Sequence, residues 1–515
     1  MSNWVHLASL ACHTLLTMTL LSPALSWAQA GRDAGAIARD LERQQTRPGK
    51  PPGTPSALEP NATPEAPMSS QSEGPRFVIQ RFDFIGLTLL SESELRRALD
   101  SWLGRELTFA DLQKALTRVT DLYEEKGWTV RPQLPEQDVG DGVVTVQLIE
   151  GKLGEVAVVN EDTPISTQQI KGILTARQRP GDPLRIDALT RGLAVLNDLP
   201  GLSAQAALKP GADLGFSDVL AIVKPSPGLT GSVMADNFGA KSTGQLRITG
   251  SWSWNNPNHL GDQTQLSLMG SEGSIYGRLV YSRPIGFDGW RAQASHSQLQ
   301  YSLLGEFSDL SASGLAVTNE LGLTYPIKRE AESNLTLSID VTRSRYVNTE
   351  VEVRSQRELS FAALGLSGDQ TDAWMGGGSN AFGINLTHGQ ATRVTDLCGC
   401  SPPTTQSFTA LEFNGSRLQR LVGSTTLRVF FSGQLAANNL DSSQKFGLGG
   451  TNGVRAYAAS EASLTMSGTT VSNREYDGST HAAVTIGNES GYVSGESLTI
   501  TAAATFDSKD AGNRT

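Results

Sequence analysis

One stretch of the chain places a charged side chain in a glycine-rich backbone. Residues 448–457 read Leu-Gly-Gly-Thr-Asn-Gly-Val-Arg-Ala-Tyr. Glycine and asparagine tolerate positive φ at low cost, so this stretch is expected to form an irregular loop. Arg455 lies between small and apolar neighbours, and its guanidinium stays charged, so it needs an acidic partner wherever solvent is scarce. The chemistry indicated is ion pairing, and the alternative is a glycine-rich turn with Arg455 at the surface.

The other polar residues do not form a pattern typical of catalysis or metal binding. The six histidines, at positions 6, 13, 259, 296, 388 and 481, lack the spacing of metal ligands. The sequence contains neither a G-x-S-x-G elbow nor a phosphate-binding loop. Cys398 and Cys400 form a Cys-Gly-Cys pair that could be a local disulfide or two free thiols. We therefore expect a protein that is not an enzyme and that uses no cofactor and no metal.

The composition limits the class of protein further. The chain has 515 residues and a net charge of −10, so we expect no nucleic-acid partner. It contains 53 glycines, and 6% of its residues are aromatic, which is typical of many short strands and turns. A chain of this length is expected to hold several domains.

The first 30 residues indicate a secretory signal peptide. Residues 7–25 are mostly apolar, and Ala28-Gln29-Ala30 is an A-x-A cleavage signal before Gly31. Because no Lys or Arg precedes the apolar run, an uncleaved membrane anchor is the alternative. No later apolar run reaches the ~18 residues of a membrane helix, so a membrane location would require a β-barrel.

Residues 31–74 are expected to begin with a short helix and to continue as a linker. Ala34, Ile37 and Leu41 fall on one face of a helix predicted over residues 31–47. The residues that follow are rich in Pro, Ser and Ala, which is the composition of a disordered linker.

The next part of the chain repeats one order of elements: strand, two helices, two strands. This order predicts a small α+β domain over residues 75–151 and another over residues 152–226. In the first, Ser91 and Glu94 form a capping box at the start of a helix, and Gly127 marks the end of a helix. Such small sheets expose strand edges, which can bind an extended chain as an added strand.

From residue 227 the sequence alternates between apolar and polar residues. Residues 335–342, for example, read Leu-Thr-Leu-Ser-Ile-Asp-Val-Thr. One apolar and one polar face over ~10 residues is the pattern of a membrane barrel, although a soluble sandwich also alternates. Aromatic residues near the short turns favour the barrel, and we count eleven strands before the glycine-rich loop. The predicted short turns cover residues 255–261, 284–289, 325–333 and 419–424.

The repeated α+β pattern resembles the outer-membrane transporters of two-partner secretion, the haemolysin secretion/activation family. The first predicted domain resembles the first polypeptide-transport-associated (POTRA) domain of that family, and the second domain resembles the next one. The resemblance of the first is carried by Tyr123, Gly127 and Trp128 in one segment and by Glu150 and Gly151 in another.

The glycine-rich loop resembles the lumenal loop of the same transporters. Val454, Arg455, Ala456 and Tyr457 match its Val-Arg-Gly-Tyr motif, with alanine in place of glycine. The resemblance implies that Arg455 pairs with an acid inside the barrel lumen. It also implies that a helix ahead of the linker plugs the pore.

The fold class implied is α+β POTRA domains followed by an antiparallel transmembrane β-barrel over residues 227–463. The POTRA domains would lie in the periplasm and capture an unfolded partner exoprotein, such as a haemolysin or adhesin, for export. The barrel would contact outer-membrane lipid. The alternatives are a surface adhesin or structural fusion protein, and a barrel-assembly factor, which is also built from POTRA domains and a barrel.

Residues 464–515 form the last predicted segment, a small all-β tail. The segments Tyr476-Asp477-Gly478 and Phe506-Asp507 belong to a pattern that resembles one YDG-type repeat of large secreted adhesins. The alternative is an unrelated Gly/Ser/Thr-rich loop and strand. Because family barrels have about sixteen strands, we expect the barrel of the chain as written to be incomplete.

Overall fold

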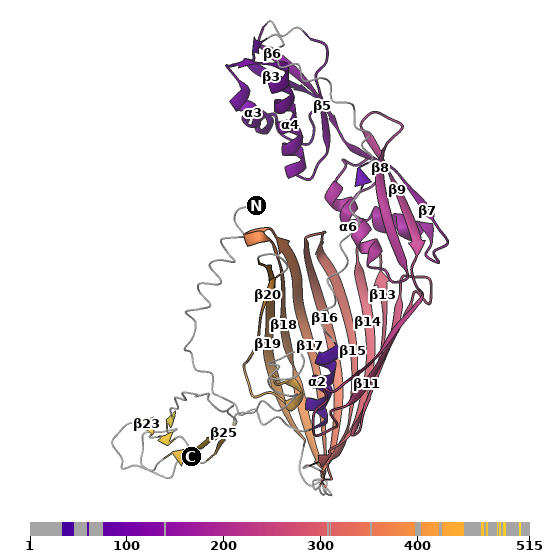
Figure 1. Ribbon diagram of the computed structural model, residues 1–515, viewed down its shortest axis with the longest axis vertical. Coiled ribbons are helices and arrows are strands. Elements are labelled where there is room, and N and C mark those ends of the chain that lie inside the picture. Colours follow the sequence, from indigo (N-terminus) through magenta and orange to yellow (C-terminus); the bar gives the residue numbers. More distant parts are fainter. Residues whose placement is uncertain are drawn as a thin grey trace.

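The protein consists of two small α+β units followed by a long curved antiparallel sheet (Figure 1). The structure, a computed structural model, describes residues 33–45, 59–60, 76–137, 141–305, 308, 311–350, 353–396, 403–421 and 425–446, and six short strands between residues 465 and 505. The predicted signal peptide, the Cys398–Cys400 pair and the loop with Arg455 lie outside the described residues.

The first α+β unit has a three-stranded sheet of order β3-β6-β5, in which β3 and β6 are parallel. Both of its α-helices begin at capping boxes, formed by Ser91 with Glu94 and by Thr108 with Asp111. Their apolar faces pack on β6 in one core, in which Tyr123 is fully buried. The elements are β2 (Phe77–Val78), β3 (Arg81–Ile85), α3 (Glu92–Leu99), η1 (Asp100–Trp102), β4 (Glu106–Leu107), α4 (Phe109–Glu125), β5 (Val130–Gln133) and β6 (Val143–Glu150).

The second α+β unit repeats this plan with a larger core. Its sheet has the order β1-β8-β9-β7, and residues from both helices and three of the strands share one apolar cluster. The outermost strand, β1 (Glu59–Pro60), comes from the segment predicted as a linker and pairs in parallel with β8 at Ala207 and Leu208. The other elements are β7 (Lys152–Asn160), α5 (Thr167–Leu174), α6 (Ile186–Asn197), β8 (Leu202–Pro210) and β9 (Phe216–Pro225).

The long sheet contains eleven strands in sequence order, which confirms the predicted number. Every neighbouring pair is antiparallel, and among the described residues β10 and β20 lie at the two edges, so the sheet is not closed. Its strands are β10 (Leu229–Asp236), β11 (Arg247–Asn255), β12 (Gln263–Ser271), β13 (Ser274–Ile285), β14 (Trp290–Ser302), β15 (Ser313–Arg329), β16 (Ser333–Glu350), β17 (Val353–Asp372), β18 (Gly378–Asp396), β19 (Thr404–Arg420) and β20 (Thr426–Ala436).

The two faces of the sheet differ as the alternating pattern predicts. On β16, Thr342, Ser344 and Tyr346 are buried on the inner face, whereas Ile339 and Val341 are exposed on the outer face. The inner face binds helix α2 (Ala34–Gln45), which packs on β14, β15 and β16 (Figure 1). The 3₁₀-helix η4 (Ser442–Gln444) also contacts α2. Of the residues predicted on the apolar side of α2, Ala34 and Leu41 are buried and Ile37 is partly buried, and Ala38 is buried beside them.

One predicted turn is too long. The prediction of a turn over residues 325–333 is wrong because β15 continues to Arg329, which leaves only residues 330–332 between β15 and β16. A register shift between Pro326 and Lys328 accommodates a proline inside the strand, where it has no N–H to donate. The 3₁₀-helix η3 (Trp374–Gly376) forms the turn between β17 and β18.

Six short strands are described in the tail. They form the antiparallel pairs β21–β25, β22–β24 and β23–β26. The strand bounds are β21 (Thr465–Ser467), β22 (Thr470–Val471), β23 (His481–Ala482), β24 (Val484–Thr485), β25 (Asn488–Ser490) and β26 (Ala504–Thr505).

None of the helices in the described ranges is long and apolar enough to cross a membrane.

Candidate functional site

Two of the predicted site residues of the first α+β unit, Tyr123 and Glu150, contact each other. The side chain of Glu150 accepts hydrogen bonds from the Tyr123 hydroxyl at 2.8 Å, from the backbone N–H groups of Thr88 and Leu89 at 2.9 Å each, and from the Thr88 hydroxyl. Burial raises the pKa of Glu150, but these donors outweigh burial and leave its pKa below the usual range. Burial and the neighbouring Glu150 raise the pKa of Tyr123. Glu150 thus ties the loop after β3 to α4.

The other residues of that predicted set lie where the two α+β units meet. Gly127 has a φ of +81°, which glycine adopts without strain, and it ends α4 so that Trp128 can reach the second unit. Trp128 forms an antiparallel bridge with Arg185, whose guanidinium lies 5.5 Å from the indole ring centre. The N–H of Gly151 donates to the carbonyl of Thr129 at 2.9 Å within the first unit, and the carbonyl of Gly151 accepts from the N–H of Leu184 in the second unit at 2.8 Å. These residues therefore join the two units.

Sequence reasoning missed a second junction, between the second unit and the long sheet. Asp288, in the turn between β13 and β14, accepts hydrogen bonds from Arg177 at 2.9 Å, Arg191 at 2.8 Å and the Tyr325 hydroxyl at 2.7 Å. The Arg191 side chain is only 7% exposed and also donates to the carbonyl of Pro326 at 2.7 Å. Three separate segments therefore meet at one carboxylate.

The charges at this junction stabilise each other. Burial raises the pKa of Asp288, but hydrogen bonds from Arg177 and Tyr325 and the charge of Arg191 leave its pKa below the usual range. Burial lowers the pKa of Arg191, and the opposite charge of Asp288 counteracts this effect. Because of these opposing effects, both Asp288 and Arg191 are charged near neutral pH.

The Tyr325 ring also stacks on Trp290, with ring centres 4.7 Å apart.

A second ion pair joins the same two parts of the molecule. Arg329, at the end of β15, donates two hydrogen bonds to Asp198, at 2.8 and 2.9 Å. The Arg329 side chain is 5% exposed, and its guanidinium also donates to Asn334 at 2.9 Å. A bidentate pair of this kind fixes both distance and orientation. We refer to the two pairs, Arg191–Asp288 and Asp198–Arg329, as the junction clamp.

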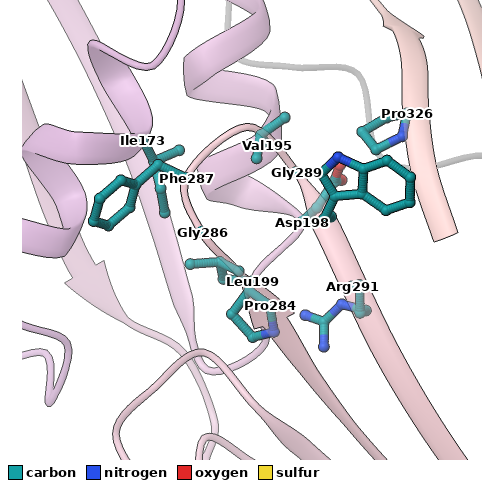
Figure 2. A pocket seen from close by; sticks show the side chains of 11 residues that line it. Ile173, Val195, Asp198, Leu199, Pro284, Gly286, Phe287, Gly289, Arg291 and Pro326 are labelled. Carbon is teal, nitrogen blue, oxygen red and sulfur yellow. The ribbon is translucent and has the colours of Figure 1, made fainter. Parts of the chain in front are cut away.

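A small cavity lies beside the junction clamp (Figure 2). It measures about 40 Å³, and since one water needs roughly 10–15 Å³, only a few water molecules fit. The cavity is thus a gap between packed parts rather than a site for a large ligand. It is lined by Ile173, Val195, Asp198, Leu199, Pro284, Gly286, Phe287, Gly289, Trp290, Arg291 and Pro326.

Helix α2 is held on the inner face of the sheet by charged contacts. Arg39 and Arg43 both form ion pairs with Glu412 on β19. At the other end of the helix, Arg357 on β17 lies 2.8 Å from Asp33 and 3.1 Å from Asp441. Asp441 belongs to the segment that follows β20, so this segment and α2 share one guanidinium.

The remaining predicted site lies outside the described residues. This applies to Val454, Arg455, Ala456 and Tyr457, and so to the acidic partner expected for Arg455. Within the described part of the chain, no group of three His, Cys, Asp or Glu side chains is arranged to hold a metal ion.

Two α+β units in tandem, followed by a sheet with an apolar outer face and a helix on its inner face, are typical of a barrel-type membrane protein with soluble domains ahead of the barrel. Residues 77–151 match the model of the POTRA domain, ShlB-type. Residues 215–500, more than half of the chain, match that of the haemolysin secretion/activation protein ShlB/FhaC/HecB. The chain belongs to this family.

Individual relatives agree with this assignment. The heme/hemopexin transporter protein HuxB of Haemophilus influenzae is 25% identical over 446 residues, which cover 84% of this chain and 78% of HuxB. The outer membrane transporter CdiB of Dickeya dadantii is 25% identical over 411 residues, 76% of this chain and 71% of CdiB. The solved structure of CdiB from Escherichia coli has the same fold, with a TM-score of 0.64, 22% identity and coverage of 84% and 82%.

These findings place the protein in the outer membrane as a transporter of two-partner secretion, with its POTRA domains in the periplasm. It exports a partner exoprotein. The end of the sheet that contacts the second POTRA domain is therefore the periplasmic end, and the opposite end faces outward.

Proposed function

We propose that this transporter captures its exported partner as an added strand on β8 of the second POTRA domain, and that linker residues Glu59–Pro60 compete for the same edge. The observation that carries the proposal is the parallel pairing of β1 with Ala207 and Leu208. A segment of this chain already uses β8 as a template for an extended strand.

Among the described residues, β1 alone pairs with the outer edge of β8. β8 has nine residues, and in the described part of the chain β1 pairs with two of them. Ser203 and Gln205 are exposed, whereas Ala204 and Ala206 are buried against the domain core. Main-chain hydrogen bonds provide affinity for an added strand with little demand on its sequence, which suits an unfolded partner.

The junction clamp supports this role. Because Asp198 and Arg191 hold the second POTRA domain on the periplasmic rim, a strand bound to β8 is kept next to the mouth of the sheet. Holding the partner there raises its local concentration at the entry to the lumen. Among the relatives are a heme/hemopexin transporter and a hemolysin transporter, so we propose a partner of the haemolysin or adhesin type.

A reversible cross-link tests the proposal. Cysteines at Glu59 and Ala207, which are direct partners across β1 and β8, would lock the linker on the edge in a chain whose Cys398 and Cys400 are replaced by serine. We expect the oxidised form to bind the N-terminal segment of the partner about tenfold more weakly or worse, and reduction to restore binding. The Glu59→Cys single variant is the control. Equal binding by the oxidised and reduced forms would contradict capture at β8.

We further propose that Arg455, in the motif Val454 to Tyr457, pairs with an acid in the lumen and holds its loop there, since its apolar neighbours disfavour a solvated charge. We also propose that transport involves no catalytic step, no cofactor and no nucleic acid. The transport roles of the relatives and the net charge of −10 support these proposals.

For residues 464–515 we propose a YDG-type adhesin repeat, supported by the Tyr476-Asp477-Gly478 segment. Antibody against this tail should label intact cells. Labelling only after the outer membrane is permeabilised would contradict an adhesin-like, outward-facing tail.

A further inference from the structure

The outer face of β16 changes from apolar to basic within two residues. Odd-numbered residues of this strand point outward, because Thr342, Ser344 and Tyr346 are buried on the inner face and Tyr346 packs in the cluster that contains α2. Along the outer face, Leu335, Leu337, Ile339 and Val341 are followed by Arg343 and Arg345. An apolar band on a barrel exterior marks the lipid core of the membrane, so the two arginines lie just beyond it.

The position of β16 shows which side of the membrane these arginines reach. β16 begins at Ser333, directly after the turn that follows Arg329, and Arg329 pairs with Asp198 of the second POTRA domain. This end of the strand is therefore periplasmic. Arg343 and Arg345 lie toward the other end, beyond the apolar band, and so at the level of the outer leaflet.

The neighbouring strands are polar at the same level. Arg343 pairs in register with Asn319 on β15 and with Ser360 on β17. Asn319 in turn pairs with His296 on β14. The His296 and Asn319 side chains share a 2.9 Å hydrogen bond on this outer face. At the level of Arg343 the change in polarity therefore extends across four strands, whereas opposite Arg345 the β15 residue is the apolar Val317.

Both guanidinium groups are accessible. The Arg343 side chain is 73% exposed and contacts Glu358 at 3.2 Å in a single ion pair, an exposed contact of a kind that contributes little. Arg345, also exposed, donates to the neutral amide of Gln356 at 3.0 Å. Two cations with one carboxylate beside them leave a positive patch at the membrane surface.

We infer that Arg343 and Arg345 form a binding site for phosphate groups of lipopolysaccharide, the phosphorylated glycolipid of the outer leaflet. Guanidinium groups bind phosphate oxygens through paired N–H donors, and residues i and i+2 of a strand present two such groups on one face. The glycolipid acyl chains would lie against the apolar band below, at Ile339 and Val341. The site fixes how deep this wall of the transporter sits in the membrane.

The test measures binding of bisphosphorylated lipid A to the full chain in detergent, with dephosphorylated lipid A as the second probe. A basic side chain at an anionic surface contributes roughly a factor of five, so Arg343→Gln/Arg345→Gln should weaken binding by about 25-fold. The double Arg→Lys variant keeps both charges but loses the paired donors, so its affinity should fall between that of the unchanged chain and that of the double Gln variant. Arg283→Gln, an exposed arginine on β13 near the periplasmic rim, is the matched control and should bind as the unchanged chain does.

Both lipid probes decide the outcome. An unchanged affinity of the double Gln variant for bisphosphorylated lipid A would overturn the inference, as would an equal loss for the dephosphorylated probe, because then phosphate is not recognised. A loss as large in the double Lys variant as in the double Gln variant would also overturn it, since charge would then not contribute. Circular dichroism of each variant shows that the sheet is intact.

Discussion

Arg191 on α6 and Asp288 in the turn between β13 and β14 form a 2.8 Å ion pair across the boundary between the second POTRA domain and the barrel sheet. The guanidinium is nearly buried, at 7% exposure, and the carboxylate is 37% exposed. Together with Asp198–Arg329, this pair joins the domain to the sheet at two points, so a partner bound to the domain is held close to the rim.

Removing the charge of Asp288 should destabilise this junction. Asp288→Asn leaves the buried Arg191 without its carboxylate, and because Asp288 is partly solvated we expect a loss of about 1–2 kcal/mol in unfolding free energy. Thermal unfolding measures the loss. Asp187→Asn breaks the exposed Arg185–Asp187 pair and is the control, with a change below about 0.5 kcal/mol. Equal effects of the two variants would show that the Asp288 pair is an ordinary surface contact.

The same carboxylate makes the junction sensitive to acid. The pKa of Asp288 is lowered in the folded protein, so its contribution is complete above the unfolded-state pKa of about 3.9 and is lost as the pH falls through the lower folded-state value. We expect hydrogen-exchange protection factors of α6 to fall below about pH 4. Asp288→Asn should show low protection at every pH. If Asp288→Asn kept the pH dependence of the unchanged chain, a group other than Asp288 would be responsible for that pH dependence.

Glu150 should govern the stability of the first POTRA domain. Glu150→Gln removes the charge that accepts the two N–H groups of Thr88 and Leu89, and we expect a loss of about 1–3 kcal/mol. Hydrogen exchange of the loop over residues 86–90 in the full chain measures the loss locally. Glu106→Gln breaks an exposed 3.4 Å contact with Arg76 and should leave exchange unchanged. Slow exchange of the loop in Glu150→Gln would contradict this role.

Arg455 should be needed for export but not for capture. Arg455→Ala is best made in a chain whose residues after Glu461 are replaced by the corresponding barrel strands of a family member. Removing one partner of a buried ion pair typically destabilises the folded state by roughly 3–5 kcal/mol, which is enough to release the loop. We expect secretion of the partner to stop while its binding to the POTRA domains is retained. Normal secretion by this variant would show that Arg455 is a surface residue.

Local patterns in the sequence were sufficient to predict the elements but not their contacts. The Ser91–Glu94 capping box located the start of α3, Gly127 located the end of α4, and alternation located the eleven strands, because all of these depend on residues near in sequence. Tyr123 and Glu150 were singled out by resemblance, yet their hydrogen bond joins residues 27 positions apart. The junction clamp was missed because Arg191 and Asp288 are 97 positions apart and neither has a distinctive neighbourhood. The pairing of Glu59–Pro60 with β8 likewise left no pattern in a Pro-rich segment.

Cross-linking in cells tests the central claim, capture of the exported partner by the periplasmic domains, most directly. A photoreactive amino acid replaces Gln205, exposed on β8, and in a matched strain it replaces Gln168, exposed on α5 of the same domain. We predict that illumination joins the full chain to the partner exoprotein from position 205 and not from position 168. Absence of a cross-link from position 205, with the chain in the outer membrane and the partner in the periplasm, would contradict the account.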